Sequence, residues 1–109
     1  MKLKILAFAV ALTLSTNLSA QNYVVIDLGT FGGSQSEAYG INNNGQVVGC
    51  ASTRSDNTVH TFLYSNGSMQ DFLGVSGIAY GINNNNQFVG AYNIASGYGD
   101  AFLYSNGSL

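Results

Sequence analysis

Residues 38–49 read AYGINNNGQVVG, and residues 79–90 repeat the stretch as AYGINNNNQFVG. FLYSNGS at residues 62–68 returns unchanged at residues 102–108. The offset is 41 residues for the first motif and 40 for the second, so one residue is lost between Gly90 and Asp100. A loss inside a strand would turn every later side chain to the opposite face, so the change in length marks a loop. The chain therefore contains two copies of one unit.

Each copy carries the signals of tight hairpins. Asn-Gly pairs stand between apolar, aromatic and β-branched runs at Asn44-Gly45, Asn66-Gly67 and Asn106-Gly107. A type I′ turn needs positive φ at both central residues, and Asn and Gly tolerate this best. The second copy has Asn86 in place of Gly45, which keeps that tolerance. Since no proline occurs and no window after residue 20 shows helical periodicity, the sequence predicts an all-β fold.

Four short strands in about forty residues, joined as a meander, match one blade of a β-propeller. We therefore expect tandem four-stranded antiparallel meanders that form propeller-like blades. Repeat one covers about residues 38–74 and repeat two about residues 79–109. An open β-meander, a solenoid and a sandwich are the alternatives, although a sandwich does not explain why the sequence repeats at the four-strand interval.

The two ends of the repeat region are related. NYVVIDLG at residues 22–29 resembles MQDFLG at residues 69–74 and predicts an N-terminal strand, with Asp27 matching Asp71. The second copy stops where its own fourth strand should begin. Propeller rings commonly close by pairing such segments, because closure removes exposed sheet edges. Two blades' worth of strands cannot close a ring of about four to eight blades. We expect a fragment of a longer repeat protein, an incomplete propeller, or else a chain that assembles with copies of itself.

Residues 1–20 have the layout of a secretory signal. Lys2 and Lys4 precede an apolar run from Ile5 to Leu14, and the polar stretch STNLSA follows. Cleavage is expected after Ala20. The run is about ten residues, whereas a membrane-spanning helix needs roughly 20. A buried N-terminal helix is the alternative. The sequence thus predicts an extracellular or cell-surface protein, with the periplasm as a further possibility, and no membrane insertion after the signal is removed.

Charge and cysteine content exclude several classes of protein. After residue 20, Arg54 is the only lysine or arginine, against Asp27, Glu37, Asp56, Asp71 and Asp100, so the net charge is about −4 (one minus five). One cation cannot neutralise several phosphates, which argues against nucleic acid and anionic membranes as partners. Cys50 is the single cysteine and has no partner for an internal disulfide. We interpret Cys50 as a semi-buried strand residue rather than a reactive thiol.

No catalytic constellation, cofactor site or metal site is predicted. His60 is the only histidine, and we interpret it as structural or surface-exposed. Asp27 and Asp71 recur at one repeat position, which indicates a repeated turn or strand-end contact to backbone N–H groups. Six aromatic residues recur at equivalent positions, and most of them are expected to be core and blade-packing residues: Tyr39, Phe62, Tyr64, Tyr80, Phe102 and Tyr104. Tyr92 and Tyr98 have no counterpart and are the candidate ligand-binding residues, suited to stacking on glycans.

Two groups of residues carry a family resemblance. They are VIDLGTFGGSQSEAYGINNNGQVVG at residues 25–49 and the tripeptides His60-Thr61-Phe62 and Asp100-Ala101-Phe102. Together they resemble the HAF repeat family of bacterial extracellular proteins, which is named for a His-Ala-Phe signature. Each copy departs from that signature at one position. The resemblance implies an exported repeat protein at the cell surface or outer membrane, and it supplies no catalytic residues.

These observations favour a secreted, non-enzymatic β-repeat protein with a structural or interaction role at the cell surface. Its expected partners are itself or further repeats of a longer chain. The first alternative is an oligomeric, lectin-like module that binds glycans. The second is a piece of a propeller hydrolase, which would need acids and bases from blades outside this sequence.

Overall fold

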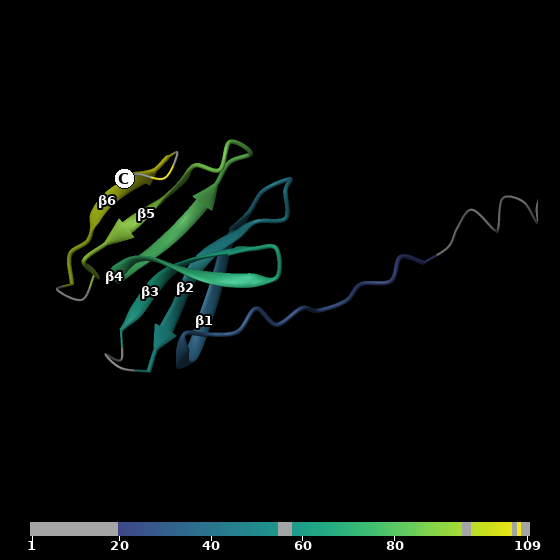
Figure 1. Cartoon of the computed structure of the whole chain (residues 1–109), viewed down its shortest axis with the longest axis horizontal. Coiled ribbons are helices and arrows are strands. Elements are labelled where there is room, and N and C mark those ends of the chain that lie inside the picture. The colour runs from purple at the N-terminus through teal and green to yellow at the C-terminus, as the bar shows by residue number, and fades with distance from the viewer. Residues whose placement is uncertain (1–19, 55–57, 95–96, 106, 108–109) are drawn as a thin grey trace, which may run out of the picture.

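The computed structural model describes residues 20–54, 58–94, 97–105 and 107, and these form an all-β structure (Figure 1). Six strands follow one another in the chain: β1 (Gly32–Ile41), β2 (Val47–Thr53), β3 (Val59–Ser65), β4 (Ser68–Ile82), β5 (Phe88–Tyr92) and β6 (Asp100–Tyr104). Each strand pairs antiparallel with the next, so the spatial order is the chain order and the sheet does not close on itself. The predicted all-β, antiparallel meander is confirmed.

The long strand β4 joins the two copies. Its residues 68–76 pair with β3, and its residues 77–82 pair with β5. Between these halves the register shifts and Gly74 has a φ of 60°. We call β1, β2, β3 and residues 68–76 the first unit, and residues 77–82, β5 and β6 the second unit. The first unit has the four predicted strands, whereas the described part of the second has three.

The turns follow the Asn and Gly positions, with one correction. Asn66 and Gly67 both have positive φ, 53° and 83°, as the type I′ prediction requires. The turn between β1 and β2 is longer, because the Asn42 N–H donates to the Gln46 carbonyl at 3.1 Å and only Gly45 has positive φ. A single left-handed residue closes this three-residue loop. The type I′ prediction for Asn44-Gly45 is therefore wrong, and Asn106 lies outside the described residues.

The conformation of Asn86 explains why the second copy can have asparagine where the first copy has Gly45. It occupies the equivalent position between β4 and β5 with a φ of 63°. Asparagine enters this left-handed region more readily than most other residues because its short amide bonds locally with the backbone. The same loop therefore forms in both copies.

The expected N-terminal strand at about residues 22–29 is not present. Residues 20–30 contain no strand, and Tyr23, Val24, Val25 and Ile26 are exposed. The chain reaches the sheet at Phe31, which forms a single parallel bridge to Thr53. A strand must pair its backbone N–H and C=O groups, and no strand of the described chain pairs with residues 22–29. In Figure 1 this segment runs away from the sheet.

The hydrophobic core lies between the two units. Its buried centre is Val48 from the first unit and Ala79, Phe88 and Phe102 from the second. Half-buried residues complete it from both sides: Leu63, Phe72, Ile82, Tyr92 and Tyr104. The second unit contributes more aromatic residues to this core than the first, and one of them, Phe88, stands where the first copy has Val47. Each unit thus completes its core with side chains of the other.

Within the described residues, no helix reaches the length and apolar character that crossing a membrane needs.

Candidate functional site: the interface between the two units

Opposite faces of the two units meet in the core. Val48 and Leu63 are register partners in the first unit, and Phe88 and Tyr104 are register partners in the second. Phe88 corresponds to Val47 rather than to Val48, since the copies are offset by 41 residues at this point. Successive side chains of a strand alternate between its two faces. The second unit therefore stacks on the first head to tail, with one face of the first unit against the opposite face of the second. The other face of each unit lies outside this contact.

Aromatic rings make most of this contact. The Phe72 ring of the first unit lies edge-on to Phe88 and Tyr104, with centroids 5.2 and 4.8 Å apart. Phe88 also stacks on Tyr104 at 4.6 Å and meets Phe102 edge-on at 6.1 Å. Aromatic pairs of this kind contribute about 0.5–1.5 kcal/mol each beyond the burial of their surface. Phe72, on the last strand of the first unit, is thus a link between the units.

Equivalent residues of the two copies also touch directly. A Cβ built on Gly40 would lie 3.1 Å from the Cα of Gly81, its own counterpart. The rings of Tyr39 and Tyr80, the preceding pair, have centroids 5.3 Å apart. Glycine inside a strand often marks such a close backbone approach. Tyr39 and Tyr80 are partly exposed and pack one unit against the other, whereas Phe62 and Phe102 are buried core residues. Both results agree with the prediction that most of the recurring aromatic residues are core or packing residues.

A ladder of asparagines connects the two turns. The Asn42 side-chain amide donates to the Asn83 carbonyl at 3.1 Å, and the Asn43 N–H donates to Oδ1 of Asn84 at 2.9 Å. Within the first loop, Asn42 accepts hydrogen bonds from two backbone N–H groups and donates one to Oε1 of Gln46. Asn83 makes the same three hydrogen bonds in the second loop, with Gln87 in place of Gln46. The repeated NNN motif was interpreted from sequence only as a turn. Its first two residues, Asn42 and Asn43, also bond to the second copy.

Two glycines hold the paired strands close at a bulge. A Cβ on Gly49 would overlap the carbonyl oxygen of Glu37, and one on Gly90 would overlap that of Ile78. In both places the register shifts, between Ala38 and Gly40 and between Ala79 and Gly81. Bulges bring a strand backbone nearer to its partner than a regular ladder does. The signal in the sequence was the recurrence of glycine at both positions.

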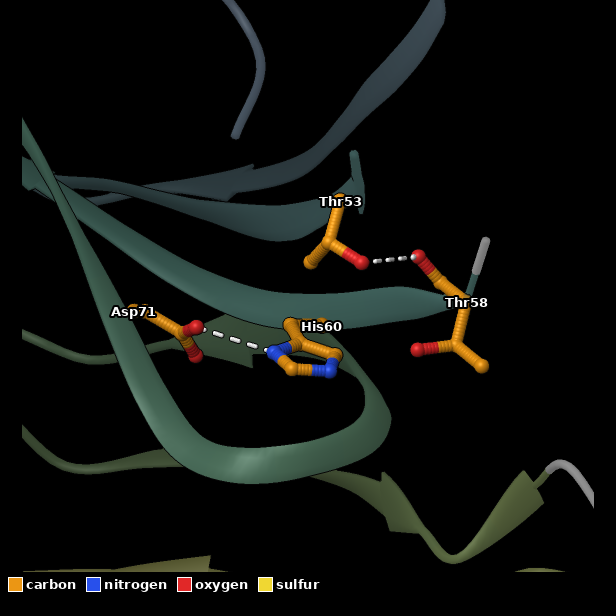
Figure 2. Close-up of polar contacts among 4 residues, drawn as sticks. All are labelled: Thr53, Thr58, His60 and Asp71. Carbon is orange, nitrogen blue, oxygen red and sulfur yellow. Dashed lines mark hydrogen bonds and ion pairs between the residues drawn. The ribbon is translucent and has the colours of Figure 1, made fainter. Parts of the chain in front are cut away.

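His60 is buried and paired with Asp71. Its Nδ1 lies 2.9 Å from Oδ2 of Asp71 on the adjacent strand (Figure 2). An oriented histidine beside a carboxylate is the arrangement of a catalytic base and its orienting group. Ser76 is the register partner of His60, but His60 exposes only 8 % of its surface, which leaves little room for a substrate. We therefore assign the pair a packing role, in agreement with the structural interpretation of His60.

Asp27 and Asp71 do not share one role. The Asp27 carboxylate accepts the backbone N–H of Gly29 at 2.9 Å, so the predicted turn contact is confirmed there. Asp71 bonds to a side chain instead, and the position of His60 is Asp100 in the second copy. The histidine–aspartate pair is thus particular to the first unit.

Thr61 contains a buried hydroxyl without a partner. The residue is completely buried, and Oγ1 makes no hydrogen bond within the described chain. An unsatisfied buried hydroxyl costs about 1–3 kcal/mol. We expect Thr61→Val to raise the free energy of unfolding by about 1 kcal/mol, because valine fills the same space and favours strands. Chemical denaturation measures the change.

Thr53→Val is the matched control for Thr61→Val. The Thr53 hydroxyl does have a neighbour, the Thr58 carbonyl at 3.5 Å (Figure 2). We expect no gain in stability from this second variant. Equal gains at both positions would show that strand propensity, not the unpaired hydroxyl, is responsible.

The two candidate ligand-binding tyrosines differ in environment. Tyr92 on β5 packs against the core, with its ring centroid 6.3 Å from that of Phe102. Tyr98, in the connection between β5 and β6, is 88 % exposed. The structure does not bring them together in one pocket. Of the two rings, that of Tyr98 is the more exposed, and Tyr92 is half-buried.

Cys50 is a buried free thiol on β2. Burial, followed by the negative charge of Glu37, raises the pKa of Cys50 above its usual value, so the thiol stays protonated. The neighbouring Tyr39 hydroxyl donates to the Glu37 carboxylate, and this hydrogen bond raises the pKa of Tyr39 to about 12. Neither group is activated as a nucleophile, since a nucleophilic cysteine needs a lowered pKa.

Among the residues that the structure describes, no three His, Cys, Asp or Glu side chains group as metal ligands. Comparisons with protein-family models, with curated protein sequences and with solved structures found no match to this chain.

Proposed function

We propose that the chain is an exported, non-enzymatic β-repeat protein with a structural or interaction role at the cell surface. The observation that supports this most is the contact between equivalent residues, Gly40 with Gly81 and Asn42-Asn43 with Asn83-Asn84. In repeat proteins each unit depends on its neighbour, and the stacked units offer an extended surface for partners. A scaffold of this kind suits binding and assembly.

The finer architecture we propose is that of propeller-like blades. The first unit has four antiparallel strands in meander order, and the second stacks on it through equivalent positions. The resemblance to HAF repeats agrees with this architecture and with a bacterial, extracellular setting. The basic and apolar start of residues 1–20 supports export.

Fractionation of bacteria that express the full chain with a C-terminal tag tests the proposal. We expect a product shortened at about residue 20 that is absent from the cytoplasm and accessible to protease on intact cells. Deletion of residues 2–20 should leave the chain in the cytoplasm. An unshortened chain that stays in the cytoplasm would contradict the proposal.

A lectin-like role is the second candidate, and the exposed ring of Tyr98 favours it. Aromatic rings stack on sugars, and the neighbouring amides can bond to sugar hydroxyls. Retention of the exported chain on cell-wall polysaccharide, lost in Tyr98→Ser, would replace the structural role by glycan binding.

A further inference from the structure

We propose that the outer face of the second unit docks a second copy of this chain, which stacks on it as the second unit stacks on the first. We define the outer face by the residues that are equivalent to buried or half-buried residues on one face of the first unit (Gly40, Val48, Cys50, Thr61 and Leu63): Gly81, Val89, Ala91, Ala101 and Leu103. The inference rests on the proposed function, because it names the partner of the repeat scaffold. Hydrophobicity, backbone shape and hydrogen bonding carry it independently.

The outer face is apolar and uncovered. Val48 of the first unit is completely buried, whereas its equivalent, Val89, is 48 % exposed. Thr61 is also completely buried, while its equivalent Ala101 is exposed, and Leu103 is 50 % exposed. A hollow of about 230 Å³ lies here, lined by Gly81, Ile82, Asn83, Gln87, Val89 and Leu103. Three positions that are buried or half-buried in the first unit are thus exposed in the second: Val89, Ala101 and Leu103.

The outer side of Gly81 leaves room for the close approach of a second backbone. Gly40 lies so close to Gly81 that a Cβ would be crowded at 3.1 Å. A Cβ on Gly81 would meet only the Val89 side chain, at 3.9 Å, and Gly81 does not have positive φ. Among the described residues, neither a steric contact nor the backbone conformation requires glycine at this position. A second backbone approaching Gly81, as Gly81 approaches Gly40, does require it.

The asparagine ladder also continues to this face. The Asn43 N–H bonds to Asn84, whereas the N–H of Asn84 donates to no group within residues 20–54, 58–94, 97–105 and 107. The side-chain amide of Asn42 has two acceptors, Gln46 and Asn83, whereas that of Asn83 has one, Gln87. Asn83 and Asn84 thus each have one N–H group without an acceptor in the described chain. The equivalent N–H groups of Asn42 and Asn43 donate to the second unit. A stacked unit would accept both.

The first unit of a second copy presents the matching surface. Val47 and Tyr64 stand at the positions of Phe88 and Tyr104, the residues that cover the first unit. Asn43 supplies the Oδ1 that would receive the Asn84 N–H. In the single chain this surface is partly covered: Phe62, the equivalent of Phe102, is buried, and residues 24–28 lie beside Val47 and Tyr64 across an apolar hollow of about 590 Å³. Docking would require this exposed segment to move aside.

The contact joins different surfaces of the two copies. Such a heterologous interface repeats in one direction, and it gives a closed ring if the rotation closes and a filament if it does not. Since the second unit already stacks on the first, every copy would add two units to the same series.

Sedimentation velocity of the exported, purified chain over a wide concentration range tests the proposal. We expect reversible association that Leu103→Asp and Gly81→Val each weaken at least about tenfold. Leu103→Asp places a charge in the apolar contact, and Gly81→Val adds a side chain where the backbone of the second copy would approach. Val75→Asp is the matched control, since it places the same charge on an apolar strand residue that is 40 % exposed and lies outside both docking surfaces. Circular dichroism shows whether each variant keeps its sheet.

A chain that stays monomeric at every concentration would overturn the docking proposal. Association that is unchanged in Leu103→Asp and Gly81→Val, with both variants folded, would overturn it too, since another surface would then be in use. Either result leaves the proposed function standing if the chain is still exported. A chain that associates but remains in the cytoplasm would contradict the proposed function instead.

Discussion

Phe88→Ala is expected to lower the free energy of unfolding by about 3–5 kcal/mol, the usual cost of emptying a buried phenylalanine site. Phe88 is almost completely buried and its ring meets Phe72, Phe102 and Tyr104. Domains of this size are stable by about 5–15 kcal/mol, so most of the stability would be lost. Urea denaturation of the wild-type chain and the variant measures the difference.

Val89→Ala is the matched control for Phe88→Ala. Val89 is the next residue of β5, and its side chain points to the opposite, exposed face. In the monomeric chain we expect this truncation to cost less than about 1 kcal/mol. Equal losses from both variants would show that the core does not lie between the units.

Gly90→Ala is expected to cost more than about 3 kcal/mol although it adds a single methyl group. The new Cβ would overlap the carbonyl oxygen of Ile78, which is backbone and cannot rotate away. The bulge between β4 and β5 would have to open, and the pairing that carries Phe88 would be lost with it. Thermal unfolding followed by circular dichroism measures the effect.

Gly81→Ala is the control for Gly90→Ala, since it adds the same methyl group to a glycine of β4, the strand that pairs with β5. At Gly81 a Cβ has room, so we expect a change within about 0.5 kcal/mol for the monomeric chain. Gly49→Ala should behave like Gly90→Ala, since its Cβ would overlap the Glu37 carbonyl oxygen. Tolerance of alanine at both Gly49 and Gly90 would contradict the tight bulges.

Much of the fold could be predicted because strand and turn signals are local. Alternating apolar residues and Asn-Gly pairs gave the hairpins, and Asn66 and Gly67 adopt the left-handed conformations that the turn type requires. The predicted strand at residues 22–29 failed for a different reason. A segment with strand-like composition forms a strand only where another strand offers its backbone groups.

The interface between the units could not be predicted, because periodicity shows that a strand has two faces but not which neighbour covers each. Both faces of β2 are largely apolar, so the pattern did not indicate that Val48 would be buried by Phe88 and Phe102. The recurrence of asparagine and glycine was visible in the sequence. Its meaning, contact between equivalent residues, depends on how the two units stack.

Native-state hydrogen exchange tests most directly whether the two units hold each other in place. If they do, amides of β3 in the first unit and of β5 in the second will share one opening free energy, and Phe88→Ala will lower both by the same amount. Full protection of β3 while β5 exchanges freely in that variant would contradict the account, because the first unit would then be stable without its neighbour.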